Sequence, residues 1–369
     1  MKHNLSLLTT TNFAHAQILA SRLELYGIPC YIRNMNLIGP EINEEVEIWL
    51  SEANIAKAGR LIREFHFNKP ENGEKPKSQF TKLIVVPVDF SPSTANAARY
   101  AVEIAAIFGA RVKLVHTYMI PQIQPVSMEG TDVLSEAVFL LLAELRKNGE
   151  NSLNELRLML TSFMDKKGIK VPIETYQING FVDEITLFLA EQEKAGLILL
   201  GLSRDNQQLF GIINDNITRI VEHSKIPVLV VTENADRKPS GKPRNILYAS
   251  NFDESDFVAI QKLISFIQKD DCNLFCTHIE SKEDPWDKVK LEGLRNFFGK
   301  KQSNIHLKFE TILASDTLEA LNQSIKSHEI DLMAITAHKH NYLSKLISKG
   351  VTKKLIYHTN IPLLIFHSN

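Results

Sequence analysis

Two short segments combine residue types that could bind a small polar or anionic ligand. Val88 and Asp89 end one apolar run, while Gly201 ends another and is followed by Arg204. A carboxylate at the end of a buried strand can accept hydrogen bonds from an adenine amino group or a ribose hydroxyl. A glycine there lets backbone N–H groups approach a phosphate. The structural alternative is that Asp89 caps a loop and Gly201 permits a turn, and the residues alone leave both interpretations open.

Alternating strand and helix patterns predict how these segments could meet. Residues 81–232 contain short apolar strands at 83–88, 111–117, 170–178, 196–201 and 227–232, separated by helical patterns at 92–108, 131–166, 182–194 and 213–224. Strands that are apolar on both faces and alternate with helices are typical of a parallel sheet covered on both sides. We therefore predict an α/β fold, a Rossmann-like, five-stranded parallel sheet with flavodoxin-like order. Its ligand site would lie between the first and fourth strands, at the carboxyl ends.

Residues 244–369 repeat this pattern. The aligned pairs are Asp89 with Asn251 and His116 with His278, at an offset of 162, and His223 with His358, at an offset of 135. The difference of 27 residues between the offsets predicts an insertion in the first copy, between Thr117 and Lys147. Two constant offsets indicate a tandem duplication.

Polar, proline-containing segments at 68–79 and 233–243 divide the chain into three domains. The predicted domains are residues 1–67, 81–232 and 244–369. The first has predicted strands at 6–10, 28–32 and 46–50 and predicted helices at 12–26 and 53–65. This βαββα order predicts a small ferredoxin-like α+β accessory domain.

These residues resemble the universal stress protein family. The resemblance rests on VPVDFS at 86–91, VH at 115–116, GFVDEI at 180–185, ILLGLSR at 198–204 and HSKIPVLVV at 223–231. It implies two tandem Rossmann-like domains that pair through their last strands, in a family divided into ATP binders and members without the ATP motif. Residues 1–67 resemble a small family of signal-transducing domains through LLTTTNFAHAQILASRLELYGIPCYI at 7–32.

The family's ATP signature is only partly present. The resemblance places Gly-x-x-Gly after the fourth strand and Gly-Ser or Gly-Thr at the start of the last helix. Gly201 supplies the first glycine, Arg204 replaces the second, and Asn214 and Asp215 replace the Gly-Ser pair. In residues 244–369 the corresponding positions hold Asn251, Thr336, Lys339 and Lys349, which implies that this second domain is degenerate and has lost ATP binding.

The first of the two domains therefore keeps at most a residual adenine-nucleotide site, for ATP or AMP. By the resemblance, Thr117 takes the position that lines adenine. The expected cofactor-binding residues are Val88, Asp89, Thr117, Gly201, Arg204, Asn214 and Asp215.

Composition narrows the function classes. Lys and Arg total 42 against 43 Asp and Glu, which argues against a general nucleic-acid binder. The N-terminus lacks a signal-peptide pattern, and no apolar run reaches the roughly 18 residues that span a bilayer. Three cysteines, Cys30, Cys272 and Cys276, fit a reducing compartment. We expect a cytoplasmic protein without membrane or nucleic-acid partners.

No nucleophile, base and orienting acid are arranged for catalysis, and no metal-ligand spacing is present, so we predict neither an enzyme nor a metal site. The expected function is that of a non-catalytic tandem universal stress protein in stress response and signalling. The alternative is an ATP-binding or ATP-hydrolysing member of the same fold superfamily. Expected interactions are intramolecular pairing of the two last strands, homo-oligomerisation, and a protein partner for residues 1–67.

Overall fold

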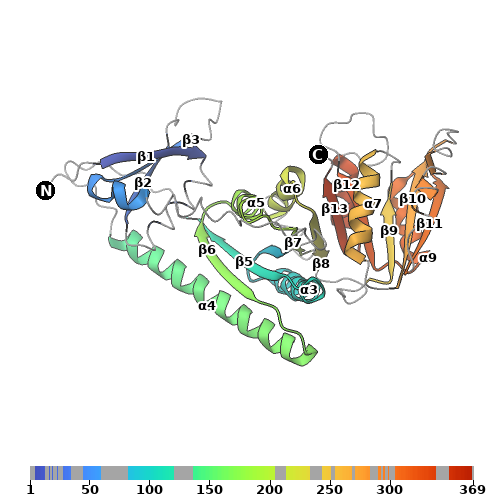
Figure 1. Cartoon of the computed structure of the whole chain (residues 1–369), viewed down its shortest axis with the longest axis horizontal. Coiled ribbons are helices and arrows are strands. Elements are labelled where there is room, and N and C mark those ends of the chain that lie inside the picture. The colour runs from blue at the N-terminus through green and yellow to red at the C-terminus, as the bar shows by residue number, and fades with distance from the viewer. Residues whose placement is uncertain are drawn as a thin grey trace, which may run out of the picture.

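The computed structural model describes residues 5–12, 16, 19, 23, 28–34, 45–59, 82–119, 136–203, 213–232, 243–250, 254–267, 271–282, 290–291, 294–295, 298, 304–337 and 349–367. Their strands form two separate sheets, one of three strands and one of ten (Figure 1). None of the described helices is long and apolar enough to cross a membrane.

The three-stranded sheet lies at the N-terminal end of the chain. It contains β1 (Leu5–Asn12), β2 (Cys30–Asn34) and β3 (Glu45–Ser51), followed by the short 3-10 helix η1 (Glu52–Asn54). The order is β1-β3-β2, and both pairs are antiparallel. Helical residues Ala16, Leu19 and Leu23 are buried against Ile48 and Leu50 of β3. The second strand was predicted at residues 28–32, and it starts two residues later, at Cys30.

The large sheet and its helices fall into two lobes. The first lobe contains β4 (Leu83–Pro87), α3 (Pro92–Phe108), β5 (Arg111–Tyr118), α4 (Glu136–Lys167), β6 (Ile173–Asn179), α5 (Val182–Gln192), β7 (Leu197–Leu202), α6 (Ile213–His223) and β8 (Val228–Thr232). The second lobe contains β9 (Asn245–Ala249), α7 (Glu254–Ile267), β10 (Cys272–Glu280), β11 (Ile305–Leu313), α9 (Thr317–Ser327), β12 (Leu332–Ala337), α10 (Lys349–His358) and β13 (Leu363–His367).

Strand order corrects one prediction. The ten strands run β11-β10-β9-β12-β13-β8-β7-β4-β5-β6, so each lobe has the order 3-2-1-4-5 counted within that lobe. This is the Rossmann order; a flavodoxin-like sheet, 2-1-3-4-5, would place the third strand beside the first. The flavodoxin-like prediction was therefore wrong, because the second crossover continues outward before the chain returns. A right-handed crossover can lead to either side, and the sequence pattern does not specify which.

The order in which strands are added to the sheet reverses where predicted, between the first and fourth strands of each lobe. In the first lobe β4 lies between β5 and β7, and in the second β9 lies between β10 and β12. Side chains of α3 and α4 pack on one face of the first-lobe sheet, and those of α5 and α6 pack on the other. Both faces are covered, which explains why the strands read as continuous apolar runs.

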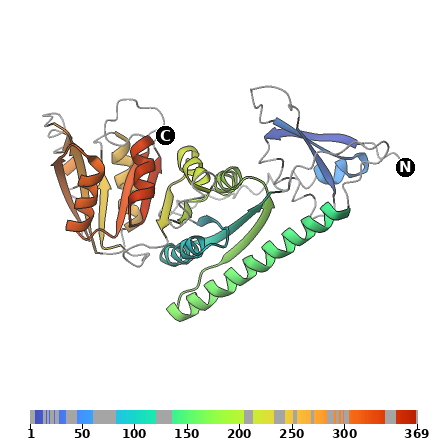
Figure 2. The ribbon, with the colours of Figure 1, turned by 180° about the vertical axis from the view of Figure 1, so that it is seen from behind.

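Element bounds locate the insertion. β4 recurs as β9 after 162 residues, whereas α5, β7 and β8 recur as α9, β12 and β13 after 135 residues. The additional residues therefore lie between β5 and β6, in the stretch that contains the 32-residue helix α4. α4 runs along the outside of the first-lobe sheet (Figures 1 and 2) and buries Leu153, Leu156 and Leu160.

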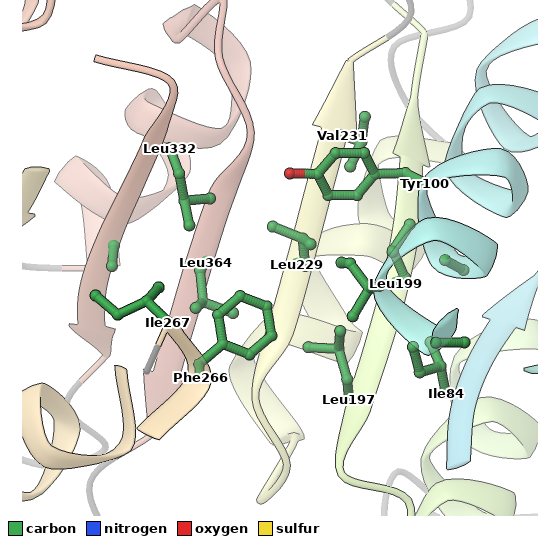
Figure 3. Close-up of a cluster of buried hydrophobic side chains, with 14 of the residues drawn as sticks. Ile84, Tyr100, Leu197, Leu199, Leu229, Val231, Phe266, Ile267, Leu332 and Leu364 are labelled. Carbon is green, nitrogen blue, oxygen red and sulfur yellow. The ribbon is translucent and has the colours of Figure 1, made fainter. Parts of the chain in front are cut away.

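The two lobes meet along β8 and β13, which pair antiparallel with Leu364 opposite Leu229. Figure 3 shows Leu364 and Phe266 of the second lobe next to Leu229 of the first. The Phe266 ring stacks on Phe108 of α3, with ring centroids 5.1 Å apart. Across the other face, His367 Nε2 lies 2.7 Å from the Val221 carbonyl oxygen. Buried apolar side chains are thus continuous from one lobe to the other.

Candidate functional site

The predicted site lies where β4 and β7 end side by side. These strands are parallel neighbours, with Val85 opposite Ile198. Extending this register by three residues brings Val88 opposite Gly201. Carboxyl ends of parallel strands meet at one edge of a sheet, so the fold brings together Val88, Asp89 and Gly201.

Asp89 organises the first turn of α3. Its Oδ1 accepts hydrogen bonds from the Ser91 backbone N–H and the Thr94 hydroxyl, each at 2.9 Å. Ser91 is the N-cap of α3, and Pro92 occupies the first helical turn. The capping interpretation of Asp89 is therefore correct. A ligand role remains compatible with it, because Asp89 is exposed and both of these bonds use Oδ1 rather than Oδ2.

His116 supports the same turn from β5. Its Nδ1 lies 3.0 Å from the Val88 carbonyl oxygen. Because a carbonyl oxygen can only accept a hydrogen bond, Nδ1 carries a proton and donates it. Its ring also contacts Phe90, with centroids 4.5 Å apart, and Phe90 has a left-handed backbone with φ of 66°. Such a backbone is strained for a phenylalanine and persists only where its surroundings hold it.

Sequence reasoning did not assign this role to His116. The available signal was its recurrence as His278, which makes the same bond in the second lobe. His278 Nδ1 lies 2.8 Å from the carbonyl oxygen of Ser250. Ser250 follows β9 as Val88 follows β4. The repeated histidine therefore positions the loop after the first strand in both lobes.

Gly201 is required by packing. A Cβ at this position would lie 2.5 Å from the Ser93 carbonyl oxygen and 2.8 Å from the Thr94 backbone nitrogen. These are backbone atoms of the first turn of α3, which cannot move aside as a flexible side chain can. The glycine therefore lets α3 start close against β7 and holds the turn that carries Asp89 near the strand ends.

We expect Gly201→Ala to destabilise the protein by about 1–3 kcal/mol, the usual cost of overpacking a fixed interior. Gly59→Ala is the control, because a Cβ there would meet nothing within 4 Å. Denaturant unfolding of both variants measures the effect. Equal stability of the Gly201→Ala variant and the wild type would show that α3 does not constrain this glycine.

The other predicted site residues are placed less completely. Thr117 lies near the end of β5, half-buried and opposite Ile178 of β6. Asn214 and Asp215 are the second and third residues of α6, in the turn where the signature would need glycine and serine. Their side chains, like the whole of Arg204, lie outside the described residues, as do Asn251 and Lys339 of the second domain.

In the second lobe, side chains occupy the corresponding space. Thr336 of β12 stands where β7 has Gly201, and its Oγ1 lies 2.7 Å from the Tyr248 hydroxyl. The Tyr248 hydroxyl donates to Asp256 Oδ1 at 2.6 Å, and the Ser250 hydroxyl donates to Oδ2 at 2.8 Å. All four residues are at most 2 % exposed. We call this set the Tyr248–Asp256 network.

The Tyr248–Asp256 network is a closed polar arrangement. Burial, and next the neighbouring Asp256 carboxylate, raise the pKa of Tyr248 well above its ordinary value, so the hydroxyl keeps its proton and remains a donor. Burial likewise raises the pKa of the Cys276 thiol. A buried thiol is inert, so Cys276, like the buried Cys272, acts as a small apolar core residue. No His, Cys, Asp or Glu cluster able to hold a metal occurs in the part of the chain that the structure describes.

Comparison with known proteins agrees with this fold. Residues 81–232 match the universal stress protein family, and residues 5–66 match the family described as "Putative prokaryotic signal transducing protein". A universal stress protein of Methanocaldococcus jannaschii is 26% identical over 151 residues, which cover 41% of this chain and 81% of that protein. The crystal structure of a universal stress protein from Archaeoglobus fulgidus, 11% identical, gives a TM-score of 0.52 and covers 79% of this chain and 98% of that one.

The first lobe is thus a Rossmann-like α/β domain with a polar switch point at its carboxyl edge. Residues 81–232 are a universal stress protein domain, preceded by a domain of the signal-transducing family at residues 5–66. The match of residues 81–232 to the universal stress protein family indicates a role of this domain in stress response.

Proposed function

We propose that this chain is a tandem universal stress protein that acts as a non-catalytic binding and signalling module in the cytoplasm. The observation that carries the proposal is the universal stress protein domain at residues 81–232, with Asp89 and Gly201 at the ends of adjacent strands. At most one adenine-nucleotide site is expected, in the first lobe, for ATP or AMP.

The tandem arrangement is supported by three features of the second lobe. Its strands have the same order as those of the first lobe, and its elements recur at the two offsets found in the sequence. His278 repeats the bond of His116 to the loop after the first strand. The similarity to the Archaeoglobus fulgidus structure extends over 79% of the chain, more than one lobe can account for.

A ferredoxin-like N-terminal domain is supported by its strand order. β3 lies between β1 and β2 and is antiparallel to both, which is the split arrangement of a βαββ unit. With its match to a signal-transducing family, this domain is the part of the chain that we assign to recognition of a protein partner.

Restriction of the nucleotide site to the first lobe rests on the Tyr248–Asp256 network. Thr336 has a buried hydroxyl and a Cβ where the first lobe has a glycine, and Asp256 adds a buried carboxylate. The negative charge of this carboxylate would repel the phosphates of a ligand in a poorly solvated site.

Thermal-shift measurements with ATP, AMP and cyclic AMP test the site. A ligand at 100 times its Kd stabilises a protein by about 2.7 kcal/mol, which is easily measured. We expect ATP or AMP to raise the Tm of the wild type and to have little effect on Asp89→Asn. Asparagine retains an Oδ1 acceptor for Ser91 and Thr94, so the comparison concerns the carboxylate charge.

Asp316→Asn is the matched control. Asp316 caps α9 in the second lobe by accepting from the backbone N–H groups of Leu318 and Glu319. It therefore caps a helix as Asp89 does, but it has no proposed ligand role. This variant should keep the full ligand-induced shift. The nucleotide proposal fails if no nucleotide shifts the wild type, and the non-catalytic proposal fails if the protein releases phosphate from ATP with multiple turnovers.

A further inference from the structure

β1 is an edge strand of the N-terminal sheet. Its hydrogen-bonded neighbour among the described residues is β3 on one side only, as the order β1-β3-β2 requires. The backbone N–H and C=O groups on the other side of β1 are therefore available to another strand within the part of the chain that the structure describes. Unpaired edges of this kind are templates for further strand pairing.

The side chains of β1 are unusually apolar for such an edge. Leu5 and Leu7 are 47% and 44% exposed. They lie on the same face of the strand, two residues apart, and Leu7 is opposite Trp49 of β3. The other face packs on the domain core through Leu8, Ile48 and Leu50. The two leucines thus form an exposed apolar strip along the edge of the outer sheet face.

β1 has only part of the usual protection against pairing: its register against β3 shifts between Leu7 and Thr9, but the strand carries no charge. Its sequence, LSLLTTTN, has no charged residue and no proline over eight residues. Natural edge strands are commonly protected by lysine, proline or inward charges. By contrast, β2 at the opposite edge carries Arg33. Of the two edges, β1 is the one suited to a strand partner.

We propose that β1 pairs antiparallel with β1 of a second copy of this chain, about a twofold axis that passes beside Ser6. In this register Ser6 lies opposite Ser6 of the partner subunit, and Leu5 lies opposite Leu7 of the partner subunit. Each exposed leucine then meets another leucine. The two three-stranded sheets become one continuous sheet of six strands.

A second copy is favoured over an unrelated strand because the edge complements itself. An uncharged strand needs no opposite charge from its partner, and the two-residue spacing of the leucines is matched by the twofold operation. In this register residues 5–7 of the two copies face one another, and antiparallel twofold pairing satisfies the free backbone groups of these residues in both copies simultaneously, as in closed isologous dimers. Cross-strand apolar pairs add to the backbone hydrogen bonds.

Disulfide trapping tests the register in the full chain. Directly opposite residues of an antiparallel pair have Cα atoms about 4.5–5.5 Å apart, within the range that a disulfide bridges. In a Cys30→Ser background, Ser6→Cys should form covalent dimers under mild oxidation. Thr10→Cys, four residues along the same strand, should not, because the proposed register does not bring Thr10 opposite its own copy.

Light scattering after gel filtration tests the interface without a cross-link. The wild type should elute with twice the mass of one chain, and Leu7→Lys should elute as a monomer with an unchanged circular dichroism spectrum. Leu158→Lys is the control, since Leu158 is 67% exposed on α4, far along the sequence, and its substitution should leave the dimer intact.

Three results would overturn the inference. These are a monomeric wild type at tens of micromolar, a Leu7→Lys variant that remains dimeric, and trapping through Thr10→Cys rather than Ser6→Cys. The trapping experiment keeps the leucines unchanged, so it decides the matter even if Leu7→Lys fails to fold. Neither experiment depends on nucleotide binding, so the nucleotide proposal and this one fail independently.

Discussion

Replacing Leu364 by aspartate is expected to separate the two lobes. Leu364 is fully buried at the centre of the β8–β13 pair, opposite Leu229. An uncompensated buried charge costs about 3–5 kcal/mol, and the apolar contact with Phe266 and Leu229 is lost as well. We expect a larger radius of gyration by small-angle X-ray scattering and a lower Tm. Cleavage within residues 233–243 by a protease should also become faster.

Leu313→Asp is the matched control. Leu313 belongs to the same lobe but is 61% exposed at the end of β11, so the same change of side chain there should affect none of these measurements. Leu229→Asp should reproduce the effect of Leu364→Asp from the first lobe. The pairing of the two last strands would be contradicted if Leu364→Asp left both the radius of gyration and the Tm unchanged.

Tyr248→Phe is expected to destabilise the second lobe by about 1.5–3 kcal/mol, the usual contribution of a hydrogen bond to a charged group. The ring still fills its space, so the loss falls on the Asp256 carboxylate, which is 1 % exposed, loses the Tyr248 hydroxyl as a donor and keeps that of Ser250. Denaturant unfolding monitored by circular dichroism measures the change. A double-mutant cycle with Asp256→Ala isolates the coupling, because these two residues are in direct contact.

Tyr100→Phe provides the comparison for Tyr248→Phe. Tyr100 is a similarly buried tyrosine on α3, and no hydrogen bond joins its hydroxyl to another described residue. Removing the Tyr100 hydroxyl should therefore lower the free energy of unfolding much less than removing the Tyr248 hydroxyl. If both tyrosine variants unfold at the same denaturant concentration, Tyr248 does not stabilise Asp256, and the Tyr248–Asp256 network does not close the ligand site of the second lobe.

The helices and strands of both lobes were predictable because they depend on local residue patterns. Ser91 and Pro92 begin α3 where expected, and the strands β4, β7 and β8 lie within a residue or two of their predicted bounds. The order of the strands in the sheet was harder to predict from the sequence. The same alternation of strands and helices is compatible with Rossmann and flavodoxin-like orders, because neighbours in a sheet are chosen by non-local packing.

The candidate site shows the same division. Sequence reasoning selected Asp89 and Gly201 but left each with two interpretations. The structure shows that Asp89 caps the first turn of α3, and that Gly201 is needed because backbone atoms of Ser93 and Thr94 lie too close to the position that a Cβ would take. The Tyr248–Asp256 network was missed, since its members belong to β9, α7 and β12 and nothing in their spacing connects them.

By itself, the sequence determined the repeated offsets and the elements of each lobe, because periodicity, caps and turns are encoded in neighbouring residues. Tertiary structure alone decided the strand order and the role of His116. It also decided which polar side chains are buried together. These features depend on contacts between residues far apart in the chain, and their free energy is set by the burial and geometry of the folded state.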